Sequence, residues 1–203
     1  MITIIDYGLG NVQAFLNTYK NLGIQAKSAK NDTDLKDASH IILPGVGSFD
    51  QAITQFKNSG MKREVEKMVL KDEIPILGVC VGMQILGNTS EEGFLKGLGW
   101  INGDIKKIQF DKTNSLPLPH MGWNDVYTKS NSKLFFELEL DLSFYFLHSF
   151  YFDCFDKSHE IAEVFYGAKM TCAVKKNNIY GVQFHPEKSH YFGTKLLKNF
   201  SNI

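Results

Sequence analysis

Long hydrophobic runs and an excess of charge of either sign are both missing from this sequence of 203 residues. No segment approaches the ~20 consecutive apolar residues that a membrane-spanning helix requires. Residues 1–5 are mostly apolar, but no basic segment precedes them and Asp6 follows at once, so they make a poor signal peptide. These absences argue against a membrane protein or a secreted one, and we expect a cytoplasmic protein.

Charge is balanced, with 22 Lys and Arg residues against 22 Asp and Glu residues. Proteins that bind nucleic acid or anionic membranes usually carry a basic excess, so the balance favours neither partner. Apolar residues make up 43% of the chain and charged residues 22%, which is ordinary for a globular protein. The length suits one domain over residues 1–203.

Cysteine is scarce, and the three cysteines, Cys80, Cys154 and Cys172, form no CxxC pair. This spacing argues against a zinc site and against a disulfide framework. The histidines are scattered, and Gly8-Leu9-Gly10 lacks the third glycine of a dinucleotide-binding turn. We therefore expect no metal and no cofactor, and each cysteine is either a buried apolar side chain or a working thiolate.

Apolar runs and amphipathic helical stretches alternate in the first half of the chain. Strands are predicted at residues 2–5, 24–29, 40–43 and 74–79, and helices at 11–22, 49–70 (broken near Gly60) and 81–86. This alternation is typical of a parallel sheet covered by helices on both faces.

The second half differs, with short strands predicted at residues 105–110, 144–147, 161–166, 172–175 and 179–184 and a last helix at 193–200. Asn177-Asn178 is typical of a hairpin turn. We therefore predict an α/β fold with a mixed, mainly parallel central sheet flanked by helices, and antiparallel additions in the C-terminal half.

Cys80 follows a predicted strand directly and lies between Gly78 and Gly82. This G-x-C-x-G pattern is the thiol form of the nucleophile elbow, in which the backbone of the nucleophile is strained. The glycines let the strand and the next helix approach closely, and the thiol projects from the carboxyl edge of the sheet. The start of that helix also favours the thiolate. The alternative is a buried structural cysteine.

His185, Pro186 and Glu187 follow the last predicted strand. A cysteine nucleophile needs a base, and the base needs a group that orients its ring. Because Pro186 ends the strand, His185 and Glu187 can lie together at the sheet edge. Taken alone, His185 could instead be a hydrogen-bonded structural histidine.

The motifs resemble those of the class I (triad) glutamine amidotransferases, and most closely the glutaminase subunits of imidazole glycerol phosphate synthase. The resemblance covers the whole chain and implies a flavodoxin-like fold. The segments that carry it are Asp6-Tyr-Gly-Leu-Gly-Asn11, Leu43-Pro-Gly-Val-Gly-Ser-Phe49, Gly78-Val-Cys-Val-Gly-Met-Gln84, Lys96-Gly-Leu-Gly99, Pro119-His-Met-Gly-Trp-Asn124, Tyr145-Phe-Leu-His-Ser149 and Gln183-Phe-His-Pro-Glu187.

The resemblance implies that Cys80 attacks the side-chain amide of L-glutamine, giving a glutamyl thioester and ammonia. His185 would carry the proton and Glu187 would fix its tautomer. Backbone N–H groups of an oxyanion hole and several substrate-binding positions are also implied. The oxyanion residues are Val81, Val46 and Gly47, and the binding residues are Gly47, Gln84, Ser149 and Phe150. Without the resemblance, residues 44–47 could be an ordinary strand-ending turn.

Two further segments, residues 6–11 and 119–124, have no evident role in thiol chemistry and could simply be turns. In this family both face a (β/α)8-barrel cyclase that consumes the ammonia and activates the glutaminase when its nucleotide ligand is bound. The resemblance thus implies that the barrel subunit is the partner. The contact residues would be Asp6, Asn11, Pro119, His120, Met121, Trp123 and Asn124.

The chain departs from the usual family pattern at the valines around Cys80, in the helix after Asn11 and at Phe150-Tyr151. The last two bear on the partner's identity. They leave open a paralogous glutaminase that supplies ammonia for amidine groups on cell-surface or flagellar sugars. A related elbow-cysteine hydrolase is disfavoured by Gln84 and His-Pro-Glu, and a non-catalytic regulatory subunit is disfavoured by the intact triad.

Overall fold

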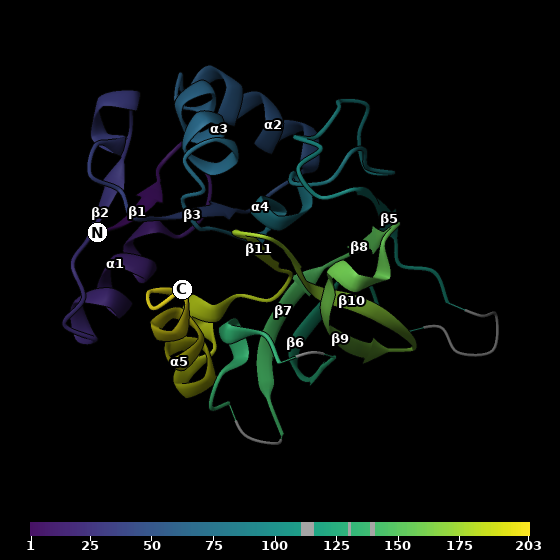
Figure 1. The fold of residues 1–203 in the computed structure, drawn as a ribbon. Helices are drawn as coiled ribbons and strands as arrows, with labels where there is room; N and C mark the ends of the chain where they lie inside the picture. Colours follow the sequence, from purple (N-terminus) through teal and green to yellow (C-terminus); the bar gives the residue numbers. More distant parts are fainter. Residues whose placement is uncertain (111–115, 130, 139–140) are drawn as a thin grey trace.

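The computed structural model describes residues 1–110, 116–129, 131–138 and 141–203, which include a nine-stranded sheet (Figure 1). Its strand order is β2-β1-β3-β4-β11-β10-β9-β6-β7. The strands are β1 (Ile2–Ile5), β2 (Ala26–Ala29), β3 (His40–Gly45), β4 (Ile76–Cys80), β6 (His120–Thr128), β7 (Ser143–His148), β9 (Glu160–Tyr166), β10 (Ala168–Lys176) and β11 (Ile179–Val182). A separate two-stranded sheet pairs β5 (Gly103–Lys107) with β8 (Phe150–Cys154).

The large sheet has a parallel half and an antiparallel half. Neighbouring strands are parallel from β2 to β11 and antiparallel from β11 to β7. Every residue of β1 and of β4 is buried, as expected for parallel strands covered on both faces. The predicted fold class, with its mainly parallel sheet and antiparallel C-terminal additions, is confirmed.

Helices cover both faces of the parallel half: α2 (Phe49–Asn58) and α3 (Lys62–Leu70) lie on one side, and α1 (Val12–Asn21) and α5 (His190–Phe200) on the other (Figure 1). The side chain of Asn11 caps α1 by accepting the N–H of Ala14 at 3.2 Å. Gly60, with φ +77°, separates α2 from α3 where the periodicity is interrupted. In the described part of the chain, no helix has the length and apolar character to cross a membrane.

Five shorter helices complete the described elements. They are the single-turn α4 (Val81–Gln84) and the 3-10 helices η1 (Asp32–Leu35), η2 (Lys133–Phe135), η3 (Lys157–His159) and η4 (Pro186–Lys188). The predicted helix at residues 81–86 is therefore shorter than expected. The predicted hairpin at Asn177 is confirmed, since β10 and β11 pair antiparallel and Asn177 has φ +53°.

The strands β6 and β8 were not predicted from the sequence. Along β6 only His120 and Val126 are buried, because most of its side chains point to the surface. The apolar alternation that marks a half-buried strand is therefore absent there. This omission matters for function because β6 and β8 both border the candidate site.

The carboxyl ends of adjacent parallel strands meet at one edge of the sheet. Gly45 of β3 pairs with Cys80 of β4, and Val182 of β11 pairs with Val79 of β4. This register places the 44–47 segment, Cys80 and the residues after Val182 side by side. Doubly wound sheets bind their ligands at this edge.

Gly82→Ala is expected to destabilise the fold, because an added Cβ would overlap the carbonyl oxygen of Leu43. Overpacking of this kind costs about 1–3 kcal/mol, and the backbone contact here points to the upper end. The free energy of unfolding in urea measures the loss.

Gly60→Ala is the control for the substitution itself, since no atom lies within 4 Å of the added Cβ, and its φ of +77° is the source of strain there. We expect this variant to lose only about 1 kcal/mol. Equal losses in the two variants would contradict the proposed close contact at Gly82.

Candidate active site

Cys80 lies at the turn between β4 and α4 with φ 56° and ψ −116°, a conformation that L-residues rarely adopt. The predicted strain at this residue is confirmed. A Cβ at Gly78 would lie 2.6 Å from the carbonyl oxygen of Gly82, so the strand and helix approach as closely as the glycine pattern predicted. Because α4 has a single turn, it carries a smaller macrodipole than a full-length helix.

His185 follows β11 and is buried, with 2% of its side chain exposed. Its Nδ1 lies 2.8 Å from Oε1 of Glu187, whose side chain is 3% exposed. The backbone N–H of His185 donates to the carbonyl of Tyr145 in β7 at 2.8 Å, which ties the histidine to the antiparallel half of the sheet. The structure thus brings His185 and Glu187 together as the sequence predicted.

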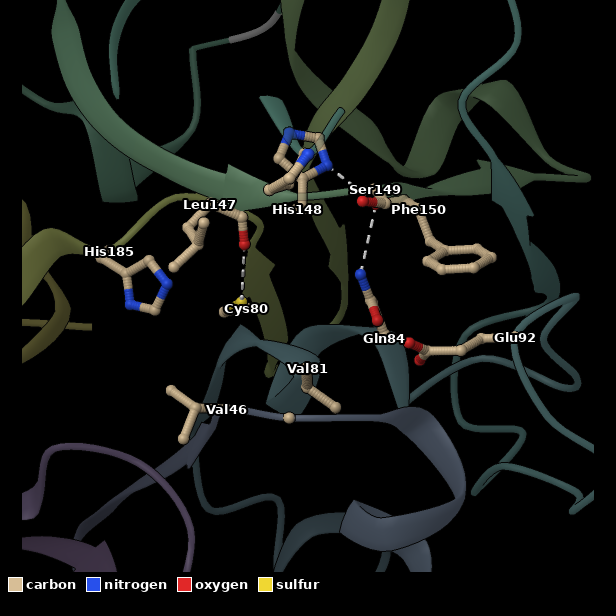
Figure 2. Close-up of a pocket in the computed structure, with 12 residues that line it drawn as sticks. Val46, Cys80, Val81, Gln84, Glu92, Leu147, His148, Ser149, Phe150 and His185 are labelled. Atoms are coloured by element: carbon tan, nitrogen blue, oxygen red, sulfur yellow. Dashed lines mark hydrogen bonds between the residues drawn. The ribbon is translucent and has the colours of Figure 1, made fainter. Parts of the chain in front are cut away.

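The ring of His185 lies beside Cys80 in the same cavity (Figure 2). Burial lowers the pKa of His185, but its interactions with Cys80 and Glu187 act in the opposite direction and raise the pKa to about 10. Nε2 of His185 is buried and has no hydrogen-bond partner among the described residues. This nitrogen is therefore free to exchange a proton with the sulfur or with a bound substrate.

The 44–47 segment borders Cys80 on the side of β3. A Cβ at Gly45 would lie 2.5 Å from the backbone nitrogen of Gly82, and Gly47 has φ +101°. Val46 and Gly47 line the same cavity as Cys80 and Val81. The predicted oxyanion residues are therefore brought together around the sulfur.

Tyr7 holds this segment in place, a role that the sequence did not reveal. Its buried hydroxyl donates to the carbonyl oxygen of Pro44 at 2.7 Å. Burial and the nearby Cys80 raise the pKa of Tyr7, so the phenol remains a neutral donor. The segment at residues 6–11 thus contacts the site itself, although only a docking role was expected of it.

The cavity has a volume of about 260 Å³ and is bordered by strands from both halves of the sheet. Its lining consists of Val46, Gly47, Cys80, Val81, Gln84, Glu92, Pro119, Leu147, His148, Ser149, Phe150 and His185. The substrate-binding residues predicted from the sequence all lie in this lining. Among the described residues no group of three or more His, Cys, Asp and Glu is arranged to hold a metal ion.

Glu92 is the one carboxylate among the described residues of this lining and was missed by the sequence analysis. Its Oε2 accepts the backbone N–H of Phe49 at the start of α2, at 2.7 Å. The carboxylate lies near Gln84 at the end of the cavity away from His185 (Figure 2). Its position in an irregular loop, far from the elbow motif, left no signal in the sequence.

A directed chain of hydrogen bonds runs beside the cavity. Nδ1 of His148 donates to the carbonyl of Phe150 at 2.8 Å, so Nε2 of His148 must accept, and Nδ1 of His120 donates to it at 3.0 Å. Nε2 of His120 then accepts from the amide of Asn124 at 3.1 Å. Burial lowers the pKa of His148 to about 3 and that of His120 to about 4, so both rings are neutral.

The residues predicted to face a partner have different surroundings. Met121 and Trp123 are 66% and 48% exposed on β6, and Pro119 is exposed at the cavity. His120, in contrast, is 2% exposed, so it lies beneath this surface rather than on it. Among the other predicted contacts, Asp6 lies 3.8 Å from Lys30, while Asn11 caps α1 and Asn124 joins the histidine chain.

Comparison with known proteins gives full-length matches. The family model for glutamine amidotransferase class-I matches residues 3–202. The chain is 52% identical over 204 residues to imidazole glycerol phosphate synthase subunit HisH of Bdellovibrio bacteriovorus, covering 100% of both chains. It is 48% identical to the protein of that name from Leptospira interrogans and 41% identical to subunit HisH 2 of Pseudomonas aeruginosa, again with 100% of both chains covered.

Solved structures share the fold at lower identity. A putative GMP synthase subunit from Thermoplasma acidophilum has a TM-score of 0.73 at 21% identity, covering 99% of this chain and 92% of that one. The structure of PurLQS from Thermotoga maritima has a TM-score of 0.71 at 19% identity, covering 99% and 97%. At these identities the likeness concerns the fold alone.

The neutral histidine pair predicts a dependence of stability on pH. The unfolded chain binds protons at His120 and His148 below pH ~6.5, whereas the folded protein does not until about pH 4 and 3. The free energy of unfolding should therefore fall as the pH is lowered from about 6.5 to about 5. Denaturant unfolding across this range measures the slope.

The double variant His120→Gln/His148→Gln should be less stable but should show a smaller slope, with His40, whose pKa is also lowered, supplying part of the remainder. Val164→Ala, a change in the buried core, should lose stability and keep the wild-type slope. An unchanged slope in the double variant would mean that the pair is not held neutral.

Proposed function

Because the chain belongs to the class-I glutamine amidotransferases and, within them, to the family of imidazole glycerol phosphate synthase subunit HisH, we propose that it is the glutaminase subunit of that synthase in histidine biosynthesis. Enzymes of this family are glutaminases. The single observation that carries the assignment to this site is the strained Cys80 turn, with the Glu187-paired His185 beside it in the same cavity.

Cys80 is the proposed nucleophile and His185 the base. The proton of the thiol passes to Nε2 of His185, and the sulfur attacks the side-chain carbonyl carbon of L-glutamine. His185 then gives that proton to the leaving ammonia, and a glutamyl thioester forms. Water, activated by the same ring, hydrolyses the thioester to glutamate. Glu187 holds the ring through Nδ1 throughout, which is supported by the 2.8 Å contact.

The oxyanion of each tetrahedral intermediate needs preorganised N–H donors. The backbone of Val81 is one proposed donor, and Val46 or Gly47 supplies the other. Both groups line the cavity at Cys80, and Tyr7 anchors the segment that carries the second. Removal of one such donor typically raises the barrier by about 3–4 kcal/mol.

The amino-acid end of glutamine is proposed to bind at the opposite end of the cavity. Glu92 can pair with the α-ammonium group, since it is the only carboxylate among the described residues of the lining. Gln84 uses its Nε2 to donate to Phe150 and to Gln183, so its Oε1 is the atom left to face the substrate. Ser149 and Phe150 border the same space, and Gly47 lies across from them.

The proposed partner is a (β/α)8-barrel cyclase subunit that forms a heterodimer with this chain and receives its ammonia. Exposed apolar side chains on β6, Met121 and Trp123, are suited to such an interface. Pro119 connects this surface to the cavity. The names of the relatives give no support to the sugar-amidination alternative.

A glutamine-mimicking electrophile, diazo-oxo-norleucine, should label Cys80 alone, and glutamine should protect against it. Cys154 and Cys172 are internal controls, because burial raises the pKa of Cys154 to about 12 and that of Cys172 well above its usual range. Mass spectrometry of peptides locates the label. Cys80→Ala should lose glutaminase activity, and Glu187→Gln should lower kcat by roughly 10²–10⁴-fold. Labelling of Cys80 that glutamine does not block would contradict the assignment.

Glutamine turnover by the purified chain should be slow and should rise by orders of magnitude when the barrel partner is added with its nucleotide ligand. The physical reason is that the docked partner closes the cavity and orders the oxyanion donors. An assay of glutamate release measures both rates. Rescue of a histidine auxotroph that lacks its glutaminase subunit tests the pathway, and failure despite good expression and an intact partner barrel would favour sugar amidination.

A further inference from the structure

Gln183 is a fully buried polar residue that touches the candidate nucleophile and that the mechanism above does not use. Its side chain is 0% exposed, and its Nε2 lies 3.7 Å from the sulfur of Cys80. The register of the sheet puts it there, because Val182 of β11 pairs with Val79 of β4, which makes Gln183 the neighbour of Cys80 across the two strands. The backbone N–H of Gln183 donates to the carbonyl of Cys172 at 2.8 Å, which holds the residue in position.

The orientation of the Gln183 amide follows from its neighbours. The carbonyl of Phe150 can only accept, so the atom of Gln84 that contacts it at 3.3 Å must be the NH₂ group. This NH₂ group also lies 3.0 Å from Gln183, so the Gln183 atom at that position must be the oxygen. The NH₂ group of Gln183 is then the one that faces Cys80.

The Phe150 carbonyl is itself held from the other side. It accepts from Nδ1 of His148 at 2.8 Å, and His148 is oriented by His120. The Phe150 carbonyl therefore accepts from both His148 and Gln84. The NH₂ group of Gln84 also donates to Gln183, and the NH₂ group of Gln183 in turn points at the sulfur. Reversing the Gln183 amide would place two donors against each other, which is unfavourable in a buried site.

The other groups around the sulfur have mixed effects on a negative charge there. His185, when protonated, stabilises it, whereas the carbonyl oxygen of Leu147, 3.8 Å from the sulfur, destabilises it. The Tyr7 hydroxyl donates to Pro44 and not to the sulfur. Further away, Glu187 pairs with His185, His148 is neutral, and Glu92 lies across the cavity. Because α4 has one turn, its macrodipole stabilises a negative charge on the sulfur less than a longer helix would. A fixed side-chain donor can therefore contribute more to that stabilisation.

We propose that Gln183 is a catalytic residue that donates a side-chain N–H to the sulfur of Cys80 while the sulfur carries negative charge, before attack on the amide and again when the thioester breaks. No proton moves to or from Gln183. The proton of the thiol goes to His185, and the amide only stabilises the anion left behind. Gln84 and the Phe150 carbonyl are positioning groups that fix which end of the Gln183 amide faces the nucleophile.

The inference rests on the proposed function, because it needs Cys80 to react as a thiolate. The test is the rate of alkylation of Cys80 by iodoacetamide as a function of pH, with the full-length chain and no glutamine. Gln183→Met has no N–H donor but nearly the same length. We expect its midpoint pH to rise by about one unit, so that alkylation near neutral pH is about tenfold slower. Well above both midpoints, the rates should agree within about twofold.

Equal alkylation rates of the wild type and Gln183→Met at high pH would show that access to the sulfur is unchanged. A merely structural role for Gln183 would give the same equality. The shifted midpoint is the readout that a structural role would not produce. Asn199→Leu is the matched control, since Asn199 is a buried amide that donates to Leu134 and Phe136 away from the site. Its alkylation profile should follow that of the wild type, and a midpoint raised equally in this control would overturn the inference.

If Gln183→Met does not fold, Gln183→Leu supplies the same comparison, and a measurement on the wild type remains. In a protein whose glutamine residues carry ¹⁵N in their side chains, the NMR chemical shifts of the Gln183 amide protons should change with pH at the midpoint of Cys80 alkylation. The same shifts should show no such change in Cys80→Ala. An amide signal that ignores the titration, or an unshifted midpoint in a folded variant, overturns the inference. If glutamine fails to protect Cys80 in the wild type, the proposed function itself is wrong, and the two failures remain distinct.

Discussion

The close packing of the β4–α4 turn against β3 is the constraint on which the site depends. Gly82 lies so near the Leu43 carbonyl that no side chain fits, and a Cβ at Gly45 would lie 2.5 Å from the backbone nitrogen of Gly82. The turn must therefore be sharp, and Cys80 takes the strain, with φ 56°. A strained nucleophile is held only where its surroundings over-determine it. Here the glycines on two strands and the register between them do so.

Around this turn, the parallel and the antiparallel halves of the sheet each supply part of the site. The parallel half carries Cys80 and the 44–47 segment at the ends of its strands. The antiparallel half brings β7 back across the same edge, where Tyr145 accepts the N–H of His185 and Leu147 faces the sulfur. The cavity therefore exists only when both halves are in place, and its lining comes from segments far apart in the sequence.

Hydrogen-bond direction links the exposed surface of β6 to the interior of the site. Asn124 donates to His120, His120 to His148, and His148 to the Phe150 carbonyl, on which Gln84 also ends. Each donor in this row is determined by its neighbour because neutral imidazole has one donor and one acceptor. Burial keeps the rings neutral, and neutrality keeps the direction constant.

Much of the fold was predictable, because buried parallel strands appear as continuous apolar runs and amphipathic helices leave a clear period in the sequence. The strand β6 was not, since most of its side chains are exposed and carry no such signal, and the five-residue β8, in which only Phe152 and Cys154 are buried, was missed as well. Within the site, Cys80, His185 and Glu187 stand in recognisable local motifs. Tyr7 and Glu92 do not, because their contacts with Pro44 and Phe49 join segments about 40 residues apart.

The sequence by itself determined the local chemistry: a thiol at a glycine-flanked turn, a histidine followed by a proline and an acid, and the class of sheet that presents them. These features depend on residues adjacent in the chain, so spacing is enough to identify them. Only the tertiary structure decided which atoms face the sulfur. Strand register placed Gln183 beside Cys80, and the Phe150 carbonyl oriented its amide. A hydrogen bond depends on the direction of single atoms, which no linear spacing records.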